Sequence, residues 1–178
     1  TLVFGCRTGY KDMTGKCVME TLPGLVSDLT GADVYEYTFI APDSEPVGID
    51  WDGSTLEASV FVDLLQVKGD NAKEEAVFTS EYYDGTGALI SNEYGKGKVY
   101  YYGSAFNELS AKTFMDKLGV MTPYSDAIDI PETCELAVRA KDGVEYLFIL
   151  NYKKESAEIT LKKEMTDLYT GDQVKGSL

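Results

Sequence analysis

Apolar positions in the first half of the chain follow the pattern of short buried strands. Residues 2–4 form an apolar run that ends at Gly5, and residues 34–39 are typical of a second strand. Further strands are predicted at residues 56–67, 76–82, 88–94 and 99–103. Gly95-Lys-Gly97 supplies a tight turn between the last two, so residues 88–103 are predicted to form a hairpin.

Two segments show the spacing of amphipathic helices instead. The first begins at Thr21, a suitable N-cap, and ends at Gly31; its apolar positions are Leu22, Leu25, Val26 and Leu29. The second runs from about Asn107 to Leu118, with Gly119 as its stop. Helices that alternate with strands in the first 120 residues predict an α/β sheet.

The pattern changes at the proline-bearing segment 123–131. Beyond it only strands are predicted, at residues 134–139, 146–151, 157–161 and 165–169, with Asp142-Gly143 as the turn between the first two. These hairpins are typical of a small all-β sandwich. The sequence therefore predicts two domains, residues 1–124 and residues 125–178.

Charge excludes two classes of partner. The 178 residues carry 30 acidic and 16 basic side chains, a formal net charge of -14, which opposes binding to nucleic acid and to anionic membranes. No apolar run approaches the roughly 18 residues of a membrane-spanning helix. Residues 17–67 hold ten acids and no base, either as a solvated acidic face or as a docking face for a basic partner.

The chain offers no recognisable catalytic chemistry. It contains no histidine, which removes Ser-His-Asp and Cys-His catalysis and His-ligated zinc. Gly5-Cys-Arg-Thr-Gly9 follows a strand but lacks the spacing of a nucleophile elbow, and Gly95-Lys-Gly-Lys98 is not a P-loop. The three cysteines form no C-x-x-C pair and no disulfide framework. No catalytic, cofactor-binding or metal-ligating residue is therefore predicted, and no cofactor.

Aromatic residues are the remaining candidates for a functional surface. Tyr100, Tyr101 and Tyr102 follow one another on a predicted strand, so their side chains alternate between its two faces and cannot all line one site. A role in the core and in an interface is therefore favoured over a sugar-stacking platform.

Several stretches together resemble the glycoside hydrolase family 42 β-galactosidases. Residues 6–12 (Cys-Arg-Thr-Gly-Tyr-Lys-Asp), 22–25 and 30–37 resemble the middle region of that family, and residues 92–103 resemble its hairpin. Residues 146–151 and 167–171 resemble its C-terminal β-domain. The order and spacing match over most of the chain, although each motif alone has low specificity.

The resemblance implies a fold and a set of partners. It implies a flavodoxin-like sheet of the class I glutamine amidotransferase type, incomplete at its N-terminus, followed by the small β-sandwich. In the family a catalytic α/β barrel precedes these domains and the middle domain builds a trimer. The resemblance therefore implies a homo-oligomer, a catalytic barrel domain of the same protein as partner, and a retaining β-galactosidase as the parent enzyme.

The sequence thus predicts a non-catalytic assembly region of a β-galactosidase, bacterial and cytoplasmic. Two alternatives stay open, a carbohydrate-binding or accessory β-module and a flavodoxin-like small-molecule binding protein. The predicted interface residues are Arg7, Tyr10, Trp51, Tyr100, Tyr101 and Tyr102.

Overall fold

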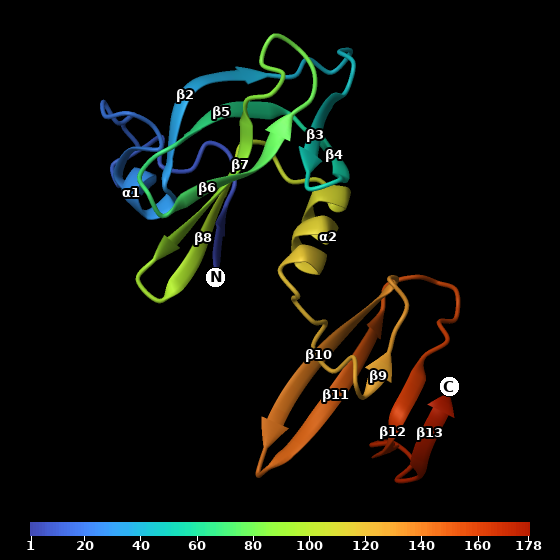
Figure 1. The fold of residues 1–178 in the computed structure, drawn as a ribbon. Coiled ribbons are helices and arrows are strands. Elements are labelled where there is room, and N and C mark those ends of the chain that lie inside the picture. The colour runs from blue at the N-terminus through green and yellow to red at the C-terminus, as the bar shows by residue number, and fades with distance from the viewer. The chain divides into compact units, whose positions relative to one another are not determined.

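Strands dominate both units of the computed structural model, which describes residues 1–178 (Figure 1). The first unit is Thr1–Gly119 and the second is Val120–Leu178. They divide at Gly119, and the predicted domain boundary after residue 124 stays a prediction. No helix in the structure is long and apolar enough to cross a membrane.

The first unit is built on one eight-stranded sheet. Its strands are β1 (Leu2–Phe4), β2 (Ala32–Phe39), β3 (Val47–Trp51), β4 (Ser54–Ala58), β5 (Phe61–Val67), β6 (Ala72–Phe78), β7 (Gly87–Tyr94) and β8 (Gly97–Tyr102). The order is β1-β8-β7-β6-β3-β4, and β5 joins β7 to β2. Only the β1–β8 pair is parallel; every other pairing is antiparallel.

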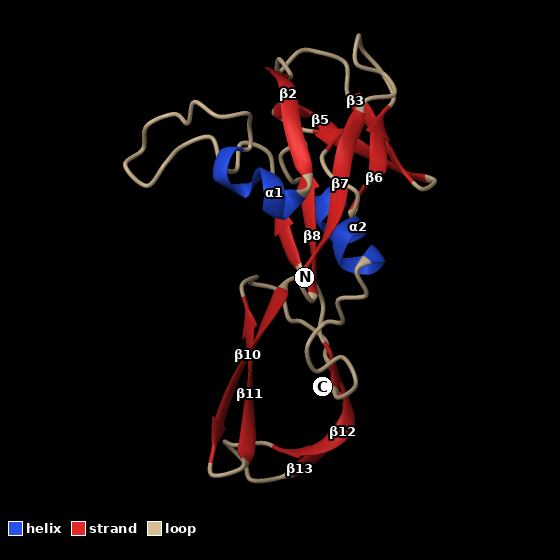
Figure 2. Ribbon diagram, turned by 60° about the vertical axis from the view of Figure 1, so that its left-hand side comes forward, coloured by secondary structure: helices blue, strands red, loops and turns tan.

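Helices are few in this unit. A 3₁₀ turn (η1, Gly24–Val26) leads into the short α1 (Ser27–Thr30), and α2 is Glu108–Lys117 (Figure 2). The expected α/β unit is therefore confirmed in its coarse form, as a sheet-dominated unit with few helices. The longer helix predicted from residue 21 to residue 31 is wrong, because Gly24 has a φ of 62° and Leu25 is 83% exposed.

The two faces of the sheet carry separate apolar cores. The first gathers Tyr100 and Tyr102 with Phe114 of α2 and Trp51 of β3. The second gathers Tyr101 with apolar side chains of β2, β5 and β7. The three consecutive tyrosines thus alternate between the faces, as the two-residue period of a strand requires.

The second unit consists of two small antiparallel sheets. One pairs β10 (Cys134–Lys141) with β11 (Val144–Asn151), and the other has the order β13 (Gln173–Ser177), β12 (Thr160–Thr166), β9 (Ile128–Asp129). Asp142 and Gly143 have φ values of 52° and 78°, which gives the tight turn of the β10–β11 hairpin. The buried apolar side chains of this unit are Ala127, Ile128 and Leu161, a small core.

Candidate functional site

A buried carboxylate organises the polar residues of the first unit. Asp63 lies in the middle of β5 and is fully buried. Its Oδ2 accepts hydrogen bonds from the backbone N–H of Arg7 at 2.9 Å and from the hydroxyl of Tyr101 at 3.0 Å, and its Oδ1 accepts one from the hydroxyl of Tyr10 at 2.9 Å. These four residues are called the Asp63 cluster below.

The sheet brings the Asp63 cluster together from distant parts of the chain. The loop after β1 supplies Arg7 and Tyr10, β5 supplies Asp63, and β8 supplies Tyr101. The backbone of Asp63 is held as well, since its N–H donates to the carbonyl of Gly103 at 2.7 Å. A β-carbon on Gly103 would lie 2.3 Å from the carbonyl oxygen of Asp63, so the close approach of these segments requires glycine there.

The electrostatics of the cluster keep its hydroxyl groups protonated. Burial, followed by the nearby charge of Asp63, raises the pKa of Tyr101 far above its usual value, and the same causes raise the pKa of Tyr10. Burial and the charge of Asp63 also raise the pKa of the Cys6 thiol to about 11. A thiol with this pKa is protonated at neutral pH and is a poor nucleophile.

The side chain of Arg7 lies among three aromatic rings. Its guanidinium carbon is 4.3 Å from the ring centre of Tyr37, 4.7 Å from that of Phe61 and 4.9 Å from that of Tyr10. These are cation–π distances. Arg7 adopts a φ of 65°, and its N–H is the one that donates to Asp63. The buried carboxylate therefore fixes the backbone from which this cation projects.

The other predicted interface residues lie inside the first unit. Trp51, Tyr100 and Tyr102 belong to the first core, where the ring of Phe114 is 4.5 Å from Trp51 and 5.3 Å from Tyr102. Tyr101 is fully buried in the Asp63 cluster. The structure thus brings together Arg7, Tyr10 and Tyr101, and it separates them from Trp51, Tyr100 and Tyr102 on the other face of the sheet.

Sequence reasoning missed the centre of this site. Asp63 was grouped with the nine other acids of residues 17–67 as part of an acidic face, but the structure buries it completely. A signal was present, because Asp63 stands in an apolar strand between Val62 and Leu64. A carboxylate in such a place requires hydrogen-bond donors around it.

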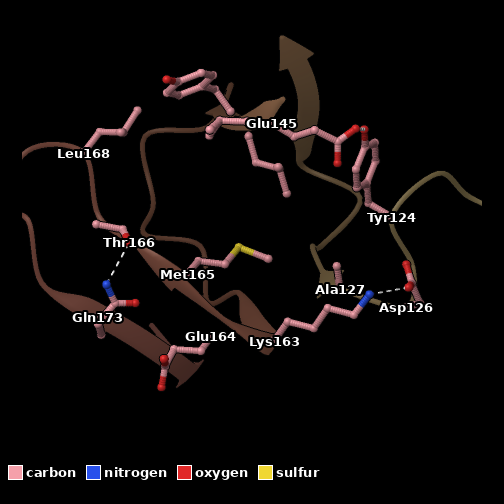
Figure 3. A pocket seen from close by; sticks show the side chains of 13 residues that line it. Tyr124, Asp126, Ala127, Glu145, Lys163, Glu164, Met165, Thr166, Leu168 and Gln173 are labelled. Atoms are coloured by element: carbon pink, nitrogen blue, oxygen red, sulfur yellow. Dashed lines mark hydrogen bonds and ion pairs between the residues drawn. The ribbon is translucent and has the colours of Figure 1, made fainter. Parts of the chain in front are cut away.

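A second candidate site is a cleft of about 550 Å³ in the second unit (Figure 3). Residues of β11, β12, β13 and the segment before β9 line it, and it combines two tyrosines, several carboxylates and an amide. Tyr124 donates its hydroxyl to Glu145 at 2.8 Å, Lys163 pairs with Asp126, and Gln173 donates to the hydroxyl of Thr166 at 2.8 Å. Met165 and Leu168 give the cleft an apolar side.

No cluster of three or more acidic or cysteine side chains is arranged to hold a metal ion. In the first site the Asp63 carboxylate accepts hydrogen bonds from three donors, and the Cys6 thiol is protonated at neutral pH. Such an arrangement fixes a loop and a surface.

Comparisons with known proteins agree on one family. A family model described as the β-galactosidase trimerisation domain matches residues 1–121, and another described as the β-galactosidase C-terminal domain matches residues 134–178. β-Galactosidase Pbg of Clostridium perfringens is 28% identical over 184 residues, which cover 98% of this chain and 26% of that protein. β-Galactosidase BgaA of Clostridium cellulovorans is 31% identical over 160 residues, covering 87% of this chain and 23% of that protein.

Solved structures resemble the fold over nearly the whole chain. Gan42B, a GH42 β-galactosidase from G. stearothermophilus, superposes with a TM-score of 0.83 at 21% identity, covering 99% of this chain and 26% of that one. The β-galactosidase from Bacillus circulans sp. alkalophilus gives a TM-score of 0.81 at 23% identity, covering 99% of this chain and 27% of that one. The chain thus spans about a quarter of the length of the proteins it matches.

Proposed function

The chain belongs to the glycoside hydrolase family 42 β-galactosidases, as their trimerisation domain followed by their C-terminal domain, and from this premise we propose that it is a non-catalytic assembly region of such an enzyme. The observation that carries the proposal is the match of residues 1–121, which includes the whole first unit, to the trimerisation domain. The proposed product of assembly is a homotrimer.

The chemistry of the first unit supports a structural role. The Asp63 carboxylate is occupied by three hydrogen-bond donors, the Cys6 thiol is protonated at neutral pH, and the sequence contains no histidine. Hydrolysis of terminal β-D-galactosides by a retaining mechanism is accordingly proposed for a catalytic α/β barrel domain of the same protein, the second proposed partner of this chain. Two carboxylates in that barrel would perform it.

Finer features of the organisation are proposed with it. The parallel β1–β8 pair supports a relationship of the first unit to flavodoxin-like and amidotransferase-like sheets. We place the functional boundary between the domains after residue 124, inside the segment that the two family models leave unmatched, 122–133. A bacterial cytoplasmic location completes the proposal.

The predicted interface residues divide into two groups. Arg7 and Tyr10 are partly exposed and are proposed to contact a neighbouring subunit directly. Trp51, Tyr100, Tyr101 and Tyr102 are buried, so their proposed contribution is indirect, through the sheet surface that they support.

Sedimentation velocity of the 178-residue chain tests the proposal, together with an assay on a chromogenic galactoside. We expect a concentration-dependent trimer and no turnover. A chain that sediments as a monomer up to millimolar concentration contradicts the assembly role, and reproducible turnover by pure protein contradicts the non-catalytic role.

The cleft of the second unit favours one further candidate function, binding of a saccharide. Tyrosine rings beside carboxylates and an amide supply stacking and hydrogen bonds of the kind that a sugar needs, and a volume of about 550 Å³ suits a small ligand. Titration with lactose, followed by nuclear magnetic resonance, tests it. Saturable shifts that disappear in Tyr124→Ala support binding, whereas shifts unchanged in that variant contradict it.

A further inference from the structure

One face of the sheet changes from a buried core into an exposed aromatic surface. Val34 of β2 lies opposite Leu65 of β5, and both are buried. Beyond a bulge after Val34, Tyr37 lies opposite Asp63 and Phe39 lies opposite Phe61. Because cross-strand partners share a face, Tyr37, Phe39 and Phe61 continue the face that carries Leu65 and Asp63.

Within the first unit this continuation is uncovered. Tyr37 is 52%, Phe39 65% and Phe61 36% exposed. β2 pairs with β5 alone among the strands (Figure 2), and its other edge carries only an isolated bridge between Val34 and Leu22. Together with Arg7 and Tyr10, these three residues form a continuous surface, called the aromatic patch below.

Arg7 gives the aromatic patch a specific polar requirement. Its guanidinium is held between the rings of Tyr37, Phe61 and Tyr10, and it forms no ion pair with any carboxylate of the chain. A planar guanidinium presents several N–H donors in a fixed fork that matches a carboxylate. A partner that covers the aromatic patch therefore needs an acidic side chain opposite Arg7.

We propose that the aromatic patch docks on a carboxylate-bearing surface of a second copy of this chain. The inference rests on the proposed assembly function and names the surface that performs it. Arginine, tyrosine and phenylalanine are enriched in the cores of interfaces, and truncation of tyrosine and arginine at such positions causes the largest losses of binding. A second copy satisfies this requirement, because the chain carries 30 acidic side chains against 16 basic ones and so has an excess of carboxylates to offer.

The geometry of a cyclic trimer agrees with this choice. In a ring, each contact joins two different surfaces of neighbouring copies, so the aromatic patch does not have to meet itself. The Arg7 cation then faces an acidic surface. The stretch 17–67 is one source of it, because it holds nine acids besides the buried Asp63 and no base.

The test compares two patch variants with two matched controls by sedimentation velocity. Phe39→Glu places a charge on the exposed end of the aromatic patch, and Arg7→Ala removes the cation. Tyr94→Glu changes a tyrosine of similar exposure on β7, and Lys11→Ala removes an exposed cation of the same loop. Fluorescence of Trp51, the single tryptophan, reports whether each variant keeps a folded first unit.

We expect both patch variants to weaken association by at least about tenfold while both controls match the wild type. Added salt should weaken the wild type more than Arg7→Ala, because the variant has lost the ion pair that salt screens. If the wild type assembles and both patch variants assemble with the same affinity, the inference is overturned and the proposed assembly function stands. A wild type that stays monomeric overturns both, and would assign the aromatic patch to another part of the same protein.

Discussion

Replacement of Asp63 by alanine should strongly destabilise the first unit. It removes the acceptor for three donors, the N–H of Arg7 and the hydroxyls of Tyr10 and Tyr101, at 2.9, 2.9 and 3.0 Å. Tyr10 is partly exposed and can turn to water, but Tyr101 is fully buried. A hydrogen bond to a charged group contributes about 1.5–3 kcal/mol, and an unsatisfied buried donor costs about 1–3 kcal/mol. Relief of the buried charge offsets part of this, which leaves an expected loss of about 3–5 kcal/mol.

Asp63→Asn separates the role of the charge from the role of the acceptor. Its amide oxygen can still accept from Arg7 and Tyr101, and its NH₂ group can donate to the hydroxyl of Tyr10, which then acts as acceptor. We expect this variant to lose about 1–2 kcal/mol, since only the charge-assisted part of the hydrogen bonds disappears.

Urea unfolding followed by the fluorescence of Trp51 measures both variants. Trp51 is the only tryptophan and lies buried in the first unit, so its signal reports that unit alone. Asp70→Ala is the matched control, an exposed aspartate whose replacement should change stability by less than about 0.5 kcal/mol. If Asp63→Ala loses no more than the control, or if Asp63→Asn loses as much as Asp63→Ala, the account of Asp63 as an acceptor of three donors is refuted.

Three further predictions use the same measurement. Burial and the charge of Asp63 raise the pKa of Tyr101 above its ordinary value near 10. The stabilisation from the Tyr101 hydroxyl is therefore complete below about pH 10, and above that pH the free energy of unfolding should fall by up to about 1.4 kcal/mol per pH unit. Tyr101→Phe should flatten this decline, and an unchanged slope in the variant would contradict the prediction. Tyr102→Phe should preserve stability or raise it by up to about 1 kcal/mol, because the Tyr102 hydroxyl is buried without a hydrogen-bond partner. A loss of stability of more than about 1 kcal/mol would show that this hydroxyl does have a partner. Asn107→Ala should cost about 1 kcal/mol, because Asn107 Oδ1 accepts from the N–H of Ser110 at 2.9 Å to cap α2, whereas Lys112→Ala on the same helix should cost little.

Elements specified by local signals could be predicted from the sequence. The hairpin at residues 88–103 appears as β7 and β8, because Gly95 takes a φ of 60° at the turn and both strands are buried along most of their length. The helix predicted from Asn107 to Leu118 appears as α2 because its cap is encoded twice. Asn107 accepts from Ser110, and Ser110 accepts from the N–H of Asn107 at 2.9 Å.

Elements that depend on distant contacts were predicted less well. The apolar run at residues 56–67 predicts one strand, but Val60 has a φ of 61° and divides it into β4 and β5. No strand is predicted at residues 47–51, although Val47, Ile49 and Trp51 alternate in β3 and are all buried. Gly48 and Asp50 stand between these apolar residues and obscure the pattern, and the strand is stabilised by pairing with β4 on one side and β6 on the other.

The buried Asp63 carboxylate and the Arg7 cation of the aromatic patch lie close together but do not pair with each other. No cation forms an ion pair with Asp63. The carboxylate is surrounded by hydroxyl and N–H donors, and the Arg7 guanidinium is left without a carboxylate partner. If Arg7 had paired with Asp63, the chain would have gained an internal ion pair, and the aromatic patch would have lost its cation. Because a buried carboxylate can be stabilised by neutral donors, the cation is free to select a partner. In a chain whose surface is mainly acidic, that selection favours another copy of itself.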